Sequence, residues 1–447
     1  MFSALDSGLT GPLFATEAMR ACFSDGARLG AMLRMQAALA RAHGMQGLAE
    51  AIEGIGVERL DFAAIGAATA VAGVPTIPFL KMVQDLLPDE AGRGLHRGAT
   101  TQDVLDTALA LQCAEAFALL AGGLDGVLAG LMGMAVRYRA AACVGRTFGQ
   151  HAAPVTFGFK AAVWLAGVAE VAARLPEVRG RMLVASLGGP VGILAGLGEQ
   201  GPVVLEKFAG ALGLGVTSVA WHVRRGRVAE TGAWLAQLVG ALGKMATDVA
   251  HLCSTEVGEV AEPYAPGRGG SSAMPHKRNP VSCTVILAAH GVAPGLAAGL
   301  LGAMAGAHER PPGLWHGEWH ALPQLFGLAS GALREGVVLA EGLEVDVGRM
   351  EENLGATRGL LFADAAAGLL AGAMGRAAAH HLVEEAAGEV RRTGVGLAEV
   401  LAQQGHDVGG AFDTGPAVRA AWVWVDRAVD EAGRVRDALK QEFVPCR

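Results

Sequence analysis

Apolar residues recur along this chain of 447 residues with the spacing of helices rather than strands. In residues 25–43 they fall on one helical face, and Gly44 follows at the position of a C-terminal cap. Further long helices are expected after Val104, over residues 230–262 and from Val281 onward. Runs of β-branched residues are few. The pattern therefore predicts an all-α fold.

The run over residues 281–307 is almost uncharged and long enough to span a bilayer. His290 and Pro294 interrupt it, Leu and Ile are sparse beside Ala and Gly, and no aromatic belt flanks it. A helix that is apolar on all sides also suits the centre of a large bundle covered by other subunits. We therefore expect a buried bundle helix and no membrane span.

Residues 95–107 interrupt the apolar pattern with a His, an Arg, hydroxyls and carboxylates around Gly98. The hydroxyls of Thr100 and Thr101 are suited to capping the helix that leads into Val104. Capping alone would account for them, so the residues themselves leave capping and ligand binding as equal alternatives.

Residues 145–155 form a second interruption, in which Thr147, Gln150 and His151 gather just before Pro154. A single histidine in an Ala-rich helical chain is more often a core residue than a catalyst. Because three polar side chains cluster here, we favour a role in a site.

Residues 221–227 carry three arginines before a helix expected from about Val228. Such a run is either solvated surface or a binding element for a substrate with several carboxylates. The adjacent His380 and His381 look like metal ligands, but neighbours on a helix point apart and no third ligand is evident. We expect no metal site.

Residues 267–280 read GRGGSSAMPHKRNP and have the composition of a mobile anion-binding loop. Three glycines within four positions let backbone N–H groups approach a ligand closely. Asn279 and Pro280 are expected as the N-cap and first residue of the next helix, whose positive end adjoins Lys277 and Arg278. The pattern predicts binding of carboxylate or phosphate.

Composition supports the helical prediction, with 52% hydrophobic and only 5% aromatic residues. A formal net charge of −7 gives no general attraction to nucleic acid, so an anion-binding site must be local. The six cysteines show neither paired nor metal-ligand spacing, and no signal peptide is recognisable before the first helix. We expect a cytoplasmic protein.

The loop resembles the signature of the fumarase and aspartase superfamily, which includes argininosuccinate lyases, adenylosuccinate lyases and 3-carboxy-cis,cis-muconate cycloisomerases. The residues that match the fixed positions of this signature are Gly270, Ser271, Ser272, Met274, Pro275, Lys277, Asn279 and Pro280. Residues 95–107 and 145–155 resemble the two other shared regions of the superfamily. The resemblance favours ligand binding over capping alone at residues 95–107.

The resemblance implies a long-helix bundle with three helical domains per subunit and a homotetramer whose central helices form one bundle. We expect an N-terminal domain in residues 1–110 and a central domain in 111–350, which carries the catalytic loop 265–280. A C-terminal domain is expected in 351–447. Active sites would combine the regions around His96, His151 and Ser271 from different subunits.

The chemistry of the superfamily adds or removes a proton beside a carboxylate, through a carbanion that spreads onto that carboxylate. By resemblance Ser271 exchanges the proton, helped by Lys277, which with Asn279 holds the substrate, while His151 is an acid or an anion binder. The other expected substrate-binding residues are His96, Arg97, Thr100, Thr101, Thr147, Gln150, Arg224, Ser272, Met274, Arg278 and Arg310. No cofactor is expected.

One departure distinguishes members of the superfamily. Fumarases, argininosuccinate lyases and adenylosuccinate lyases carry a glutamate five positions after the signature Asn, where this chain has Thr284. A carboxylate, with a pKa of about 4, leaves without protonation, so the loss suits a carboxylate nucleophile or leaving group. Residues 96–100, 308–319 and 422–425 resemble the cycloisomerases. We expect conversion of the tricarboxylate 3-carboxy-cis,cis-muconate to 4-carboxymuconolactone, in protocatechuate breakdown through the β-ketoadipate pathway.

Two alternatives remain. Elimination of the adenylosuccinate lyase type is one, although Thr284 and a missing His-Asp pair near residues 73–78 argue against it. A non-catalytic structural oligomer is the other, and the presence of Ser271, Lys277 and Asn279 argues against it. Residues 223–227 depart from the cycloisomerase pattern and leave the identity of the polycarboxylate open.

Overall fold

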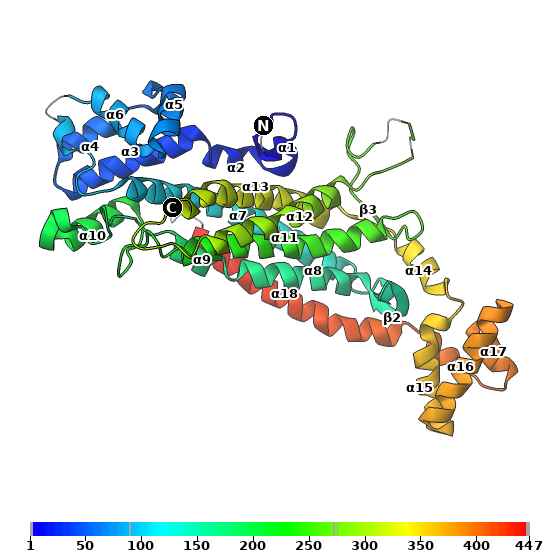
Figure 1. Cartoon of the computed structure of the whole chain (residues 1–447). Coiled ribbons are helices and arrows are strands. Elements are labelled where there is room, and N and C mark those ends of the chain that lie inside the picture. Colours follow the sequence, from blue (N-terminus) through cyan, green and yellow to red (C-terminus); the bar gives the residue numbers. More distant parts are fainter. Residues whose placement is uncertain (1–2, 89–90, 271–272, 275, 444–447) are drawn as a thin grey trace.

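The computed structural model describes residues 3–88, 91–270, 273–274 and 276–443, and its fold is the predicted bundle of long helices (Figure 1). The central helices are α7 (Thr101–Arg137), α8 (Phe157–Ala172), α11 (Gly226–Leu252), α12 (Val281–Gly302) and α13 (Leu314–Gly342). The long α18 (Gly415–Phe443) packs on α7 and α8. The core between these helices is aliphatic and aromatic, with Phe117 in contact with both Trp234 and Phe326.

Further helices lie at one end of this bundle and along its side. They are α1 (Gly11–Phe14), α2 (Glu17–Cys22), α3 (Asp25–Ala42), α4 (Gln46–Glu53), α5 (Phe62–Ala72), α6 (Thr76–Leu86), α9 (Leu175–Met182) and α10 (Gly201–Leu212). The predicted helix over residues 25–43 is confirmed as α3, with Ser24 accepting from the N–H of Ala27 and Gly44 at a φ of 75°.

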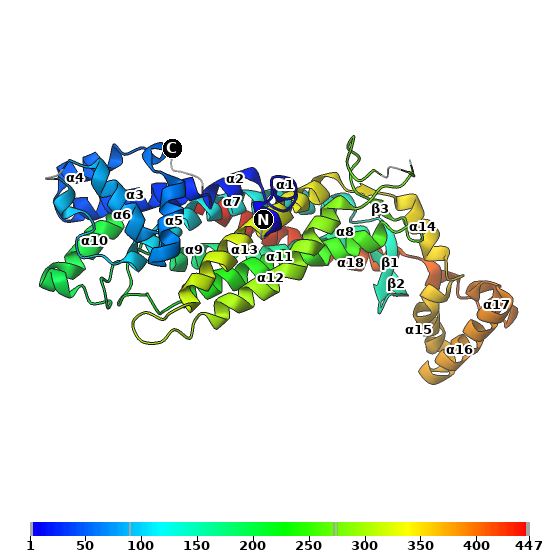
Figure 2. The same ribbon diagram turned by 45° about the horizontal axis from the view of Figure 1, so that its top comes forward.

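At the opposite end, α14 (Val347–Gly355), α15 (Ala363–Met374), α16 (Arg376–Thr393) and α17 (Leu397–Gln403) project from the bundle (Figures 1 and 2). Helices α15 to α17 share a small apolar core of their own. Six 3₁₀ turns complete the described helices: η1 (Ala4–Asp6), η2 (Val57–Arg59), η3 (Ala91–Gly94), η4 (Ala195–Gln200), η5 (Leu360–Phe362) and η6 (Gly409–Phe412).

The domain boundaries at residues 110 and 350 stay a prediction. Helix α7 passes through residue 110 without a break. Although α18 follows the projecting helices in sequence, its buried Val425, Ala432 and Leu439 belong to the core of the central bundle.

One element was not predicted from the sequence, and one predicted helix is shorter than expected. Residues 145–155 form most of an antiparallel hairpin of β1 (Ala142–Thr147) and β2 (Gln150–Thr156). The helix expected over 230–262 ends at Leu252, and the chain then turns at Gly258, with a φ of 64°, into β3 (Val260–Ala261). That strand pairs with β4 (Glu344–Val345).

The expected N-cap at Asn279 is also wrong. Helix α12 begins at Val281 after Pro280, and no side chain at its own start caps it. Instead the N–H groups of Ser282 and Cys283 each donate to the carboxylate of Glu262, at 2.9 Å. A buried acid from the preceding segment thus satisfies the amides that Asn279 was expected to satisfy.

Within the described residues, α7 and α12 are long and apolar enough to cross a membrane, judged by length and composition. In this fold α7 packs against α3, α8, α13 and α18, while α12 packs against α11 and α13.

Candidate active site

Those predicted site residues that the structure describes lie on segments at two opposite ends of the bundle (Figures 1 and 2). His96 precedes α7, and the hairpin with His151 follows its far end, so the 37 residues of α7 separate them by roughly 55 Å. Arg224 precedes α11 and the catalytic loop follows it, which separates these two by roughly 40 Å over 27 residues. One chain therefore cannot bring both ends to one small substrate.

His96 lies at the first end, in a turn where His96 and Gly98 have φ angles of 61° and 80°. Its Nδ1 is 3.3 Å from Nε2 of Gln36. Burial lowers the pKa of His96, although the charge of Asp103 acts in the opposite direction. The ring is thus neutral near pH 7. The adjacent Arg97 is exposed, and its carbonyl contacts the ring of His43.

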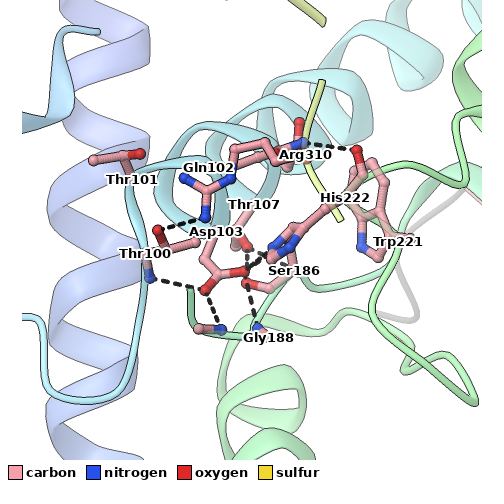
Figure 3. A network of polar contacts seen from close by, with 12 residues as sticks. Thr100, Thr101, Gln102, Asp103, Thr107, Ser186, Gly188, Trp221, His222 and Arg310 are labelled. Carbon is pink, nitrogen blue, oxygen red and sulfur yellow. Dashed lines mark hydrogen bonds and ion pairs between the residues drawn. The ribbon is translucent and has the colours of Figure 1, made fainter. Parts of the chain in front are cut away.

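Arg310 reaches the same end from the connection between α12 and α13. Its Nη2 donates to Oγ1 of Thr100 at 2.9 Å (Figure 3). It also donates to the carbonyl of Pro190 at 2.8 Å. Thr100 directly precedes α7 and Thr101 is its first residue, so these groups lie at the positive end of a long helix. Hydroxyl, guanidinium and helix terminus together form a suitable binding place for a carboxylate.

Beneath these residues lies a buried acid, Asp103, which was not among the site residues expected from the sequence. Asp103 accepts from the N–H of Thr100 at 2.9 Å and contacts Nε2 of His222 at 2.6 Å (Figure 3). The spacing of Thr100 and Asp103 is that of a capping box and was visible in the sequence. Nothing local in the sequence pointed to His222, which is 119 positions away.

Two of the three arginines in residues 221–227, Arg224 and Arg225, have different surroundings. Arg225 is buried between Asp106 and Glu318, at 2.8 Å from each, and these two carboxylates raise its pKa against the opposing effect of burial. Arg224 is exposed and donates to the carbonyl of Val219 at 3.2 Å. Of these two, Arg224 is therefore the one accessible to a substrate.

At the second end, His151 lies on β2 and faces Arg146 across the hairpin, while Thr147 pairs with Gln150. Burial and the nearby charge of Arg146 lower the pKa of His151, and Glu259 opposes them. Arg146 is itself held by Glu259, with 2.6 Å between the closest N and O atoms. Thr147 also lines a hollow of about 680 Å³ between the hairpin, α8 and α11.

The stems of loop 265–280 are held together where the N–H of Asn279 donates to the carbonyl of Gly269 at 2.8 Å. Arg278 donates to both oxygens of Glu344, at 2.9 and 2.8 Å, and Arg268 to Glu335 and Ser282. A hollow of about 510 Å³ lies beside the loop and is lined by Met274, Lys277, Arg278 and Asn279, among others. The predicted residues Ser271, Ser272 and Pro275 lie outside the described residues.

The two ends together offer cationic groups, hydroxyls and helix N-termini, which are donors suited to polycarboxylates. In the described part of the chain no three His, Cys, Asp or Glu side chains are grouped so as to hold a metal ion.

Comparison with known proteins agrees with this donor set. Residues 16–295 match the family model described as Lyase. The chain is 43% identical over 438 residues to 3-carboxy-cis,cis-muconate cycloisomerase of Pseudomonas aeruginosa, with 94% of this chain and 95% of that protein covered. It is 41% identical over 416 residues to nitrosuccinate lyase of Streptomyces davaonensis, with 89% and 88% covered.

The fold also matches a solved structure. The crystal structure of 3-carboxy-cis,cis-muconate lactonizing enzyme from Pseudomonas putida superimposes with a TM-score of 0.92 at 41% identity. The match covers 96% of this chain and 100% of that one.

Proposed function

Since the chain belongs to the Lyase family, in the fumarase and aspartase superfamily, we propose that it converts 3-carboxy-cis,cis-muconate to 4-carboxymuconolactone. Relatives of nearly full length that carry this activity support the proposal. We place the reaction in the breakdown of protocatechuate by the β-ketoadipate pathway and the enzyme in the cytoplasm.

The observation that carries the proposal is Thr284. This residue lies on the first turn of α12, and its hydroxyl donates to the carbonyl of Pro280 in the same chain segment at 2.8 Å. By resemblance, fumarases, argininosuccinate lyases and adenylosuccinate lyases have at this position a glutamate that orients the active-site histidine. A reaction whose nucleophile is a carboxylate needs no histidine-glutamate pair to move a proton at the nucleophile, because the carboxylate reacts in its ionised form.

The proposed reaction forms one C–O bond and one C–H bond. A substrate carboxylate oxygen adds to one carbon of a double bond, and the π electrons move to the neighbouring carbon and onto the carboxylate attached to it. Lys277 and Asn279 hold this developing charge, and the hydroxyl of Ser271 delivers a proton to the neighbouring carbon. Ser271 then regains its proton from solvent. We assign His151 to the same step, as an acid or an anion binder.

The remaining substrate contacts come from both ends of the bundle. At the first end we assign His96, Arg97, Thr100, Thr101, Arg224 and Arg310 to substrate carboxylates. At the second end we assign Thr147, Gln150, Ser272, Met274 and Arg278. Because α7 separates the two ends by roughly 55 Å, we propose a homotetramer in which different subunits supply the two sets.

The first test is the loss of 3-carboxymuconate ultraviolet absorbance on addition of the purified full-length protein. We expect rapid loss with wild type and a rate about 10²- to 10⁴-fold lower with Ser271→Ala, because a positioned proton donor contributes about this much. Ser218→Ala removes an exposed hydroxyl elsewhere and should keep the wild-type rate. Full activity in Ser271→Ala would move the proton transfer to Lys277 or His151, and an inert wild type would exclude the cycloisomerase.

Nitrosuccinate lyase is a second candidate function, because a relative with that activity is 41% identical over most of the chain. Nitrite is also an anion that leaves without protonation, so Thr284 fits this elimination too. Release of nitrite from nitrosuccinate, measured beside the absorbance assay, separates the two. We expect the larger kcat/KM with 3-carboxy-cis,cis-muconate, and the reverse order would assign the chain to nitrosuccinate.

A further inference from the structure

Asp103 is the centre of a buried polar network that joins three segments of the chain. Its side chain is fully buried, and both of its oxygens are occupied (Figure 3). Oδ1 accepts from Oγ of Ser186 at 3.2 Å and from the N–H of Gly188 at 2.9 Å, and it also contacts His222. Oδ2 accepts from the N–H groups of Thr100 and Gly189, each at 2.9 Å. One carboxylate therefore holds five donors.

The network exceeds what capping of α7 requires. A cap would need an acceptor for Thr100 alone, whereas Ser186, Gly188, Gly189 and His222 lie outside that helix. One turn further along α7, Thr107 donates to the carbonyl of Ser186 at 2.9 Å and accepts from its N–H at 3.0 Å. The two side chains of α7 thus fix both the position and the register of residues 186–189 on the helix.

The segment held in this way reaches the candidate substrate residues. Gly189 has a φ of 68° and packs so closely on the turn before α7 that a Cβ atom would lie 2.9 Å from the carbonyl oxygen of Gly98. The carbonyl of the next residue, Pro190, accepts from the guanidinium of Arg310, which also holds Thr100. Asp103 therefore anchors the backbone of both groups that orient Arg310.

We propose that Asp103 is a positioning residue. It holds residues 186–190 (the floor segment) against α7, so that Pro190 and Thr100 aim the Arg310 guanidinium at a substrate carboxylate. Asp103 itself is buried and makes no contact with substrate. The part of this inference that concerns substrate binding rests on the proposed function, whereas the anchoring of the floor segment does not.

The test compares Asp103→Asn with Asp106→Asn. Asp106 is also buried on the first turns of α7, but its partners are Gln102, Arg225 and Trp315, none of which belongs to the floor segment. An Asn at 103 keeps the shape of Asp but turns one acceptor into a donor that faces the N–H donors around it. The two variants thus introduce the same change into two neighbouring networks.

The first readout is amide hydrogen exchange, which needs no substrate. We expect exchange at Gly188 and Gly189 to become about 10- to 100-fold faster in Asp103→Asn, because their N–H groups lose a charged acceptor, and to stay at the wild-type rate in Asp106→Asn. Wild-type exchange rates in Asp103→Asn would overturn the proposal. If wild type does not turn over 3-carboxy-cis,cis-muconate, the proposed function fails while this readout still decides the anchoring.

The second readout is steady-state kinetics with 3-carboxy-cis,cis-muconate. For Asp103→Asn we expect KM to rise about tenfold and kcat to change less than about threefold, because a misplaced Arg310 weakens a contact made by bound substrate and transition state alike. Asp106→Asn should keep the wild-type KM even where its thermal midpoint falls. Equal increases of KM in both variants would reduce Asp103 to a general stabilising residue and overturn the proposal.

A second pair of variants covers the case in which Asp103→Asn does not fold. Gly189→Ala displaces the floor segment while Asp103 stays intact, and Gly196→Ala is its control, since a Cβ there meets no atom within 4 Å. We expect a higher KM in Gly189→Ala and an unchanged KM in Gly196→Ala. An unchanged KM in Gly189→Ala would contradict the proposal.

Discussion

His96 is a largely buried imidazole whose surroundings favour the neutral form. Burial lowers its pKa in the folded chain, whereas in the unfolded chain the ring returns to about 6.5. As the pH falls through 6.5 the unfolded chain binds more protons than the folded one, so stability present above that pH is lost below it. His151, whose pKa is also lowered, contributes an effect of the same sign.

We therefore expect the thermal midpoint of wild type to fall between pH 7 and pH 5, and to fall less in His96→Gln. Thermal unfolding followed by circular dichroism at intervals of half a pH unit measures the difference. His380→Gln, which changes an exposed histidine on α16, should keep the wild-type dependence. Parallel curves for His96→Gln and wild type would show that His96 is not the group responsible.

Glu262 lies outside α12 and caps the N-terminus of this helix, where no residue of its own start does so. Its carboxylate accepts from Ser282 and Cys283, at 2.9 Å each, and places a negative charge at the positive end of the helix that follows the catalytic loop. In Glu262→Gln one oxygen becomes a donor that opposes one of these N–H groups. We expect the free energy of unfolding to fall by about 1–2 kcal/mol, the usual cost of a lost cap.

The midpoint of urea unfolding tests this expectation. Glu341→Gln removes an exposed carboxylate near the end of α13 and should leave the midpoint at the wild-type value. The same midpoint in Glu262→Gln and wild type would mean that the neutral amide caps α12 as well as the acid does.

The elements that the sequence predicted well are those set by local pattern. Helix α3 has an N-cap, an apolar face and a C-terminal glycine between Ser24 and Gly44, and its predicted bounds were confirmed to within one residue. The hairpin was missed because its strands are short and irregular, with a change of register between Gly145 and Arg146. The cap of α12 was wrong because its acceptor, Glu262, lies twenty positions before Ser282.

The same limit applied to the candidate site. Loop 265–280 can be recognised because its residues are contiguous in the sequence. The capping-box spacing of Thr100 and Asp103 is visible in the sequence in the same way. Nothing in the sequence distinguishes Arg224 from Arg225. The turn before α11 nevertheless exposes Arg224 and buries Arg225. The pairing of Asp103 with His222 depends on tertiary contact across 119 positions, which no local pattern encodes.

At the scale of the whole molecule, the tip of the hairpin at the second end is exposed. Phe148 stands at the tip of the hairpin with a φ of 51° and its side chain fully accessible, beside Thr147 and Gln150. A bulky residue in the left-handed region is strained, and an exposed aromatic side chain gains nothing from burial. Contact with another subunit would cover this side chain and bring the first end of a neighbouring chain to the second end of this one.

Subunit sharing predicts complementation between variants that damage opposite ends. Arg310→Ala removes a candidate donor at the first end and Ser271→Ala the proposed proton donor of loop 265–280, so each alone should be strongly impaired when the substrate concentration is well below KM. When the two are unfolded together and refolded as a mixture, a site that takes each end from a different, randomly chosen subunit is intact in about one case in four. We expect about a quarter of wild-type activity, measured by loss of 3-carboxymuconate absorbance.

Arg310→Ala mixed with Thr100→Ala should show no such recovery, because both changes lie at the first end. If the first mixture stays as inactive as its components while refolded wild type regains activity, each site is built within one chain, and the roughly 55 Å set by α7 would require a different set of catalytic residues.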